Sequence, residues 1–322
     1  MKTLRNISFW LLLVVVAAVA LLPIAQGNVS MREDAFYILM LVILASSTNL
    51  IMGYTGYVSF GHIVFFGTGG YVAFYLMQTF QWHFVPAAVV GGFAASLLAF
   101  LLGNAVLRLR GAYFALATIG INEAIRSFVT NFEPLGGSVG MFFNFSVYDA
   151  YGGAKTAGQL AYYAMVVLAL ATVAASFLIK KSKFGLGLMS IREDQDASMV
   201  LGINPAQMKV ITYTISAFFP AIAGAIFFFK SGIIEPGSAF DLYRSVEALV
   251  MVMLGGYGTV TGPIVGAVVY ERLRGFFITN ETFSNFHLVI AGALLLLIVL
   301  FVPAGLVGWL RLRFAAVRRF LE

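Results

Sequence analysis

The stretch "FVPAAVVGGFAASLLAFLLGNAVL" (84–107) contains no charged side chain, and Arg108 and Arg110 follow it directly. An α-helix needs about 20 consecutive apolar residues to cross the roughly 30 Å hydrocarbon core of a bilayer. Basic residues just beyond such a run are typical of the cytoplasmic surface of a membrane. The stretch therefore predicts a membrane-spanning helix that ends at a basic membrane surface.

The rest of the chain has the same character. Its 322 residues are 61% hydrophobic and 11% charged, with a mean hydropathy of +0.93, whereas about 25% of the residues in a soluble domain are charged. We therefore expect an all-α polytopic membrane protein. Val246–Arg272 fits either one kinked helix or two short ones, because Gly255, Gly256 and Gly258 interrupt it. The other expected spans are Phe9–Ala25, Ala35–Met52, Val58–Met77, Ala112–Val129, Leu160–Ile179, Val210–Phe229 and Phe286–Val302.

The distribution of basic residues predicts the topology, because cytoplasmic loops carry an excess of Lys and Arg. If the N-terminus lies inside, Arg108 follows four spans and Lys180 follows six, so both lie inside. Two short passes within Val246–Arg272 then give about ten helices and place the tail inside as well. This arrangement leaves the positive charges of Arg272 and Arg274 outside, where Glu271 compensates part of them. The basic residues concerned are Lys2, Arg5, Arg108, Arg110, Lys180, Lys181, Lys183, Arg311, Arg313, Arg318 and Arg319.

Lys2 and Arg5 before an apolar run also resemble the start of a signal peptide, but further spans follow, so we expect an uncleaved first helix. No linker separates domains, so we expect one membrane domain over residues 1–322. Its cytoplasmic features are a polar region at about 180–209 and a basic tail at about 308–322.

Several classes of site are absent from the sequence. There is no cysteine, which excludes disulfides and thiolate metal sites. The glycine-rich stretch "MLGGYGTVTGPIVGA" (253–267) lacks the lysine of a nucleotide-binding loop. The three histidines are scattered and give no metal-ligand spacing and no Ser-His-Asp arrangement. We expect no catalytic residue, no metal site and no cofactor bound by this chain, and we attribute the net charge of +6 to topology and anionic lipid rather than to nucleic acid.

The most polar internal stretch is "IREDQDASMVLGINPAQMKV" (191–210), which we expect in the cytoplasm after the sixth helix. The basic run "KKSKFGLGL" (180–188) predicts a surface loop before it. Acidic residues favour a helix N-terminus, Gly202 predicts a stop, and Asn204 with Pro205 predicts a restart, giving two short helices. This segment is either a solvated connector or a docking helix that presents Met199–Leu201 to a partner.

Polar residues within the apolar runs are candidates for a transport pathway. His62 is either such a residue or a neutral histidine bonded to a backbone carbonyl. Glu123 and Arg126, three residues apart on one helix face, form either a buried stabilising pair or a gating pair. The candidate pathway residues are Ser59, His62, Tyr113, Thr118, Asn122, Glu123, Gly255 and Gly256.

Four stretches together resemble the LivM-type permease subunit of branched-chain amino acid ABC importers. They are "SFGHIVFFGTGGY" (59–71), "LRGAYFALATIGINEAI" (109–125), "SKFGLGLMSIREDQDASMVLGINPAQMKVITYTISAFFPAIAGAI" (182–226) and "SVEALVMVMLGGYGTVTGPIVGA" (245–267). The resemblance implies that the third stretch is the cytoplasmic region that meets the ATPase, with Asp196-Ala197-Ser198 and Gly202 at the E-A-A and G positions of the importers' EAA loop. The coupling residues it implies are Arg192, Glu193, Asp194, Asp196, Ala197, Ser198, Leu201 and Gly202.

The resemblance further implies a type II-like ABC importer permease fold, working by alternating access in the bacterial inner membrane with both termini cytoplasmic. Its partners would be a LivH-like second permease, two cytoplasmic ATP-binding subunits that hold ATP and Mg²⁺, and a periplasmic substrate-binding protein.

The sequence departs from this family at two places. Ala112 replaces a usual proline, and "LGGSVG" (135–140) replaces T-G-G-S-D-G. The substrate could therefore be urea, a short amide or another small solute. A secondary transporter or channel working alone stays open as another class, although Glu123 is the only deep acid that the spans suggest. A membrane enzyme, or a sugar or nucleoside permease of the same superfamily, fits the motifs less well.

Overall fold

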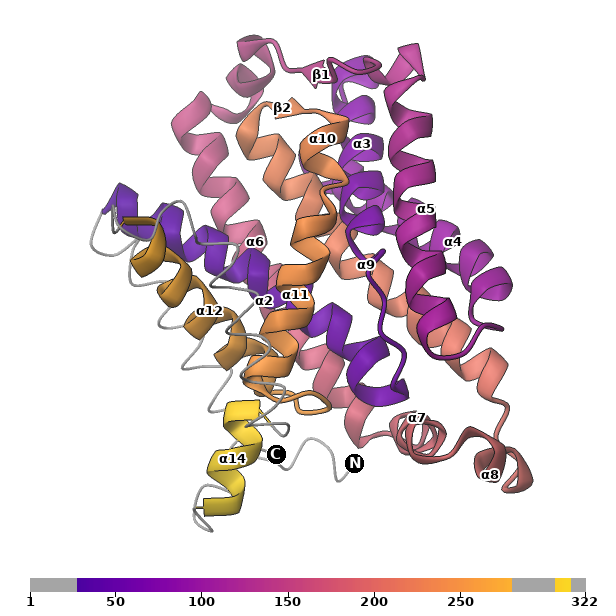
Figure 1. Ribbon diagram of the computed structural model, residues 1–322. Coiled ribbons are helices and arrows are strands. Elements are labelled where there is room, and N and C mark those ends of the chain that lie inside the picture. The colour runs from indigo at the N-terminus through magenta and orange to yellow at the C-terminus, as the bar shows by residue number, and fades with distance from the viewer. Residues whose placement is uncertain (1–27, 280–304, 314–322) are drawn as a thin grey trace.

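The computed structural model describes residues 28–279 and 305–313 (Figure 1). Almost all of this part is helical, and one large apolar core runs through it. The elements are α2 (Val29–Thr55), α3 (Ile63–Phe80), α4 (Phe84–Val106), α5 (Ala112–Thr130), η2 (Glu133–Leu135), β1 (Met141–Phe142), η3 (Phe145–Tyr151), α6 (Ala154–Lys181), α7 (Lys183–Glu193), α8 (Gln195–Val200), α9 (Pro205–Ser231), β2 (Ile233–Ile234), α10 (Pro236–Ala239), α11 (Leu242–Gly255), α12 (Gly262–Thr279) and α14 (Gly305–Arg313).

The long helices form a bundle with two distinct ends. In Figure 1, α7 and α8 lie at the lower end, which we call the α7–α8 end, and β1, β2 and α10 lie at the upper end, the β1–β2 end. By length and composition, α2, α3, α4, α6 and α9 are able to cross a membrane. Helix α5 is more polar, α11 is shorter, with 14 residues, and α12 is as long as α3 but carries Glu271, Arg272 and Arg274. The described part therefore has the build of a multi-pass membrane protein.

Most predicted spans coincide with helices, but one begins later than expected. The spans expected at 35–52, 84–107, 112–129, 160–179 and 210–229 correspond to α2, α4, α5, α6 and α9. The span expected from Val58 is wrong at its start, because α3 begins only at Ile63. Gly56 ends α2 in the left-handed region (φ 78°) and donates its N–H to the Met52 carbonyl. The spans expected at 9–25 and 286–302 lie outside the described residues.

Helices α3, α4 and α9 cross at very close range. A Cβ added to Gly69 of α3 would collide with the backbone of Ala221 in α9, and one added to Gly224 of α9 would collide with the backbone of Phe66 in α3. On α4, Gly91 lies equally close to the Gly69 carbonyl. Small residues at such crossings let membrane helices pack by van der Waals contact, which replaces the hydrophobic force that lipid does not supply.

The segment expected at 246–272 forms two helices, α11 and α12, joined by a turn over 256–261. The turn is held by Asn49 of α2, whose Nδ2 donates to the Thr259 carbonyl (2.8 Å) and whose Oδ1 accepts from the Gly258 N–H (2.9 Å). The Thr259 hydroxyl adds bonds to the Gly256 carbonyl (2.7 Å) and the Gly262 N–H (2.9 Å). Side-chain hydrogen bonds therefore satisfy backbone groups that the helix break leaves open.

At the β1–β2 end, the connection between α5 and α6 is tied to the bundle. Strand β1 pairs antiparallel with β2, with Met141 opposite Ile234 and Phe142 opposite Ile233. In η3, the Tyr148 hydroxyl donates to the Phe229 carbonyl (2.8 Å). These contacts attach the 131–153 segment to the end of α9.

Candidate functional site

The polar segment that the sequence singled out begins with a helix, so the surface loop expected at 180–188 is wrong. Ser182 caps α7 by accepting the Gly185 N–H at its Oγ (3.1 Å). A Cβ on Gly185 would collide with the Ile179 carbonyl, and one on Gly187 would come within 2.7 Å of the Met208 side chain. These glycines serve close packing and do not mark a loop.

The predicted stop and restart around Gly202 are confirmed. Asp194 caps α8, because its Oδ1 accepts the N–H groups of Asp196 and Ala197, both at 2.9 Å. Gly202 has φ +82°, a left-handed conformation that favours glycine. Asn204 then caps α9 by accepting the Gln207 N–H (3.2 Å). The second short helix expected after Gly202 is wrong, because the restart at Pro205 begins the long α9.

The end of α8 carries an unusually exposed apolar group. Met199 is 46% exposed, Val200 87% and Leu201 76%. Nothing lies within 4 Å of a Cβ built on Gly202, whereas Ser198 is buried beneath. We call residues 199–202 the α8 tip. Clustered apolar side chains that face outward in this way are typical of an interaction surface.

Arg192 connects α7 to two other elements. Its Nη1 donates to the Gly53 carbonyl of α2 (2.9 Å), and its guanidinium lies 5.6 Å from the centre of the Tyr257 ring in the α11–α12 turn. Its Nη2 also pairs with Glu193 at 2.8 Å. Arginine suits this position because its planar group hydrogen-bonds in several directions and stacks on rings. Of the predicted coupling residues, Arg192 therefore faces the bundle, and Glu193 is exposed.

Lys209, in the first turns of α9, is almost fully buried. Its Nζ donates to the Tyr57 hydroxyl (2.8 Å), the Leu107 carbonyl (3.0 Å) and Gln195 Oε1 (3.2 Å). Tyr57 in turn donates to Gln195 (3.1 Å); burial raises the pKa of its hydroxyl, with Arg110 opposing, so the neutral phenol that donates is favoured. The sequence analysis missed this cluster, although a lone lysine in the first turn of a span was a signal for it.

A second polar link joins α8 to the α4–α5 turn. Arg110 donates to both carboxylate oxygens of Asp196, at 3.0 and 3.4 Å. The two side chains are 59% and 66% exposed, so water screens the pair and it adds little to stability. Helix α8 is thus connected to α9 and the α4–α5 turn, and α7 to α2 and the α11–α12 turn.

The candidate pathway residues lie in several parts of the described bundle. Thr118 and Asn122 are buried and anchor α5 to its neighbours: Thr118 Oγ1 accepts the Phe60 N–H (3.1 Å), and Asn122 Nδ2 donates to the Phe240 carbonyl (3.0 Å). Glu123 and Arg126 pair at 3.7 Å and are 53% and 43% exposed, and Asn122 Nδ2 also donates to Glu123 Oε1 (3.5 Å). Of the two alternatives for this pair, a buried stabilising pair is therefore wrong.

Of the remaining candidates, Ser59 and His62 flank Phe60 and Gly61, which contact Thr118, and the other three lie elsewhere. Ser59 and His62 are buried before α3, where the His62 ring packs edge-on against Phe65 and Tyr213. Tyr113 is 75% exposed on α5. Gly255 and Gly256 belong to the end of α11 and its cap.

The buried acid of the described chain is Glu247, which the sequence analysis did not identify. It is 2% exposed on α11 and accepts a hydrogen bond from the Tyr270 hydroxyl of α12 (3.0 Å). Arg274 lies 3.7 Å from Glu247 and 3.5 Å from Glu271 and donates to the Tyr37 hydroxyl (3.1 Å). The expected offset of Arg274 by Glu271 is thus present, together with a second, buried partner. Among the described residues, no group of His, Asp and Glu side chains could hold a metal ion.

Comparison with known proteins identifies the family that this sequence matches. The family model "Branched-chain amino acid transport system / permease component" matches residues 32–299. The high-affinity branched-chain amino acid transport system permease protein LivM of Salmonella typhimurium is 27% identical over 96% of this chain and 77% of its own length. LivM of Escherichia coli is 28% identical over the same shares. BraD of Pseudomonas aeruginosa, a permease protein of the same kind of system, is 25% identical over 83% of this chain and 91% of its own. No solved structure matches the chain.

Proposed function

The chain belongs to the family of permease components of branched-chain amino acid transport systems, and on that premise we propose that it is the membrane-spanning permease subunit of an ATP-driven ABC importer for branched-chain amino acids. The observation that carries the proposal is the match of the family model across residues 32–299, which contain the α8 tip and its polar links. The partners are a LivH-like second permease, two ATP-binding subunits that hold ATP and Mg²⁺, and a periplasmic substrate-binding protein. The chain itself binds no cofactor and hydrolyses nothing.

We propose that the α7–α8 end is cytoplasmic. Arg108, Arg110, Lys180, Lys181 and Lys183 all lie in or beside the segments of that end, and positive charge is typical of the cytoplasmic side. Counting the spans that the sequence predicts at 9–25 and 286–302, the chain has ten spans in a type II-like arrangement. Both termini then lie in the cytoplasm of a bacterium, and the permease lies in its inner membrane.

In this arrangement the α8 tip docks on an ATP-binding subunit. Val200 and Leu201 supply apolar contact, and the open space at Gly202 admits close approach of the partner. Asp194 and Ala197 hold the shape of α8 through the cap, while Ser198 is packed beneath it. The role of these residues is thus to present a rigid apolar surface.

The polar links then distribute the motion of α8. Arg110 and Asp196 pass it to the α4–α5 turn, and Gln195 passes it through Lys209 to α9. Through α7, Arg192 passes it to α2 and to the turn between α11 and α12. ATP-driven closure of the partner subunits would therefore rock helices on several sides of the bundle, which is the requirement of alternating access.

The test is a double variant, Val200→Asp with Leu201→Asp, at side chains that no described contact uses. We expect the double variant to insert into the membrane and to keep its thermal stability, but the ATP-binding subunits should no longer copurify with it. ATP-driven uptake of leucine, isoleucine or valine should fall at least about tenfold, because a carboxylate buried in an apolar interface is strongly unfavourable. The matched control Leu201→Met keeps an apolar side chain and should behave as the wild type. Normal copurification and uptake in the double variant would refute docking at the α8 tip.

The alternatives have their own readouts in the same assay. The segment 135–140, where this sequence departs from its family, lies at the β1–β2 end with Gly136 and Gly140 in left-handed conformations. If the substrate is instead urea, a short amide or another small solute, ATP-driven uptake of that solute will exceed uptake of branched-chain amino acids. The buried Glu247 is the kind of group that a secondary transporter uses. Uptake by this chain alone in liposomes without ATP would favour that function.

A further inference from the structure

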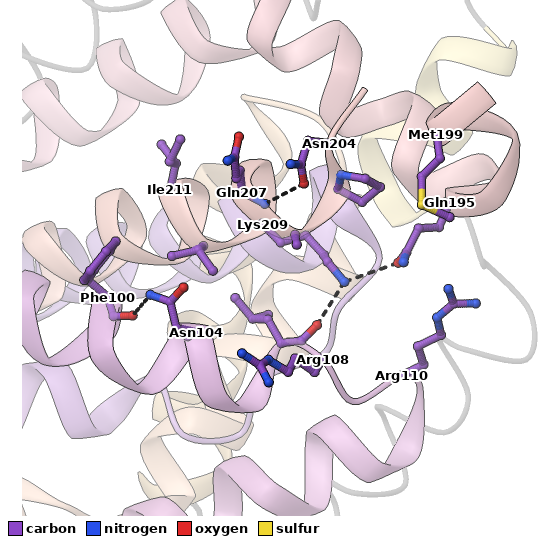
Figure 2. Close-up of a pocket in the computed structure, with 15 residues that line it drawn as sticks. Phe100, Asn104, Arg108, Arg110, Gln195, Met199, Asn204, Gln207, Lys209 and Ile211 are labelled. Atoms are coloured by element: carbon purple, nitrogen blue, oxygen red, sulfur yellow. Dashed lines mark hydrogen bonds between the residues drawn. The ribbon is translucent and has the colours of Figure 1, made fainter. Parts of the chain in front are cut away.

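A cavity of about 610 Å³ opens between α4 and α9 at the α7–α8 end. Figure 2 shows Asn104, Arg108 and Arg110 of the α4–α5 segment on one side and Gln207 and Lys209 of α9 on the other, with α8 closing one end. Arg110, Gln195 and Lys209, which link α8 to the bundle in the proposed coupling, line this cavity, but no ligand has been assigned to it.

The cavity carries uncompensated positive charge. Lys209 donates only to neutral acceptors, namely a phenol, a carbonyl and an amide. Arg108 makes no ion pair with any carboxylate in residues 28–279 or 305–313, and Asp196 is already bound to Arg110. Three cations and one carboxylate leave a surplus of two positive charges in this wall of the cavity. The start of α9 also lines it and adds the positive end of a helix dipole.

An exposed apolar stripe leads to the same place along α4. Phe93, Leu97 and Phe100 are 63%, 61% and 47% exposed, and their spacing of four and three places them on one helix face. The stripe continues toward the cavity and ends at Asn104 and Arg108. Because α4 is long and apolar enough to cross a membrane, this face passes from hydrocarbon to the level of the headgroups.

We propose that the cavity binds the phosphate headgroup of an anionic phospholipid, with an acyl chain lying along the α4 stripe. Basic pockets between membrane helices are suited to such headgroups. A free phosphate or a nucleotide would meet the same cations, but the apolar walls formed by Phe100, Leu107 and Ile211 favour a ligand that carries hydrocarbon. Because Gln195 and Met199 of α8 also line the cavity, a bound lipid holds α8 against α4 and α9. Its effect on transport rests on the proposed function, whereas its binding does not.

The binding test compares Arg108→Gln with Lys183→Gln, in the purified complex in nanodiscs of phosphatidylcholine with a minor fraction of phosphatidylglycerol. Both residues are exposed and lie near the same end, but only Arg108 lines the cavity. Native mass spectrometry should find one phosphatidylglycerol retained on the wild type and on Lys183→Gln, and about fivefold lower retention on Arg108→Gln, the factor expected for one basic residue at an anionic surface.

Equal retention in all three proteins would overturn the proposal. Millimolar inorganic phosphate that displaces the lipid completely would identify a free-phosphate site and would also overturn it. So would a lipid that is retained on the permease purified alone but lost from the complex with the ATP-binding subunits, because the cavity would then be part of their interface. Leucine uptake should be stimulated by phosphatidylglycerol in the wild type and not in Arg108→Gln. Failure of uptake in every protein would count against the proposed function and leave the lipid count valid.

Discussion

Asn49→Ala should release the turn between α11 and α12. The Asn49 side chain is fully buried and is the sole side chain of α2 that bonds to this turn in the described part of the chain. The substitution removes the bonds to Gly258 N–H (2.9 Å) and to the Thr259 carbonyl (2.8 Å). Each buried group left without a partner costs about 1–3 kcal/mol, and water can replace part of that loss.

We therefore expect a loss of about 3 kcal/mol in the free energy of unfolding. For a chain of this size each kcal/mol corresponds to roughly 2 °C, so the apparent unfolding midpoint should fall by about 6 °C. The midpoint is measured by tryptophan fluorescence of the detergent-purified chain at a fixed heating rate, since unfolding of such a protein is not reversible. Chymotrypsin should also cut faster after Tyr257, the exposed aromatic residue of the turn.

The control is Asn131→Ala, at an exposed amide that bonds only to its own helix, through Ser127. Its midpoint should move by less than about 1 °C, as for surface substitutions in general. If Asn49→Ala unfolds within 1 °C of the wild type and is cut no faster, the turn is not held by Asn49, and its role in satisfying the broken helix is refuted.

Three further outcomes follow from other contacts. Tyr57→Phe keeps the ring beneath the buried lysine but removes the hydroxyl that accepts from it; the unfolding midpoint should fall by the equivalent of about 1–2 kcal/mol, and no fall would show that the bond is not made. Gly224→Ala places a methyl group against the backbone of α3, so the variant should not elute as a monodisperse peak in size-exclusion chromatography. The control Gly158→Ala has open space around the new methyl group and should elute as the wild type. Equal elution of the two variants would contradict the close α3–α9 crossing. Asp196→Ala breaks an exposed pair with Arg110 and should leave the unfolding midpoint close to that of the wild type while lowering ATP-driven uptake. Unchanged uptake would remove this pair from the coupling route.

The sequence predicted the features that depend on composition and on local bonding. Spans such as Phe84–Leu107 follow from length and apolar content, because only a helix satisfies its backbone in hydrocarbon. The cap at Asn204 and the stop at Gly202 involve neighbours in the chain, so residue type alone indicates them. The division at Gly255 and Gly256 came from charge counting, and the turn observed there agrees with it.

The features that the sequence did not predict depend on distant partners. The extended entry to α3 is held by the Thr118 hydroxyl, which accepts the Phe60 N–H, and by the Ser245 hydroxyl, which accepts the Ile63 N–H. Glu123 is exposed and Glu247 buried because tertiary packing sets which face of each helix turns inward. Gly185 and Gly187 were interpreted as loop residues. The sequence alone does not distinguish a glycine that is needed for close packing against a neighbouring helix from one that is needed for a turn.

The glycine crossings of α3, α4 and α9 have a mechanical consequence. Backbone in direct contact with backbone has no side chain to repack, so these helices cannot slide past one another without collision. Helices α3, α4 and α9 therefore form a rigid unit that moves as one body. Helix α5, by contrast, buries only Phe114, Thr118, Asn122 and Val129, and the hydrogen bonds of Thr118 and Asn122 join it to the residues beside α3 and α10. Such bonds can break and re-form one at a time, so α5 can move against these three helices more easily than they can move against one another.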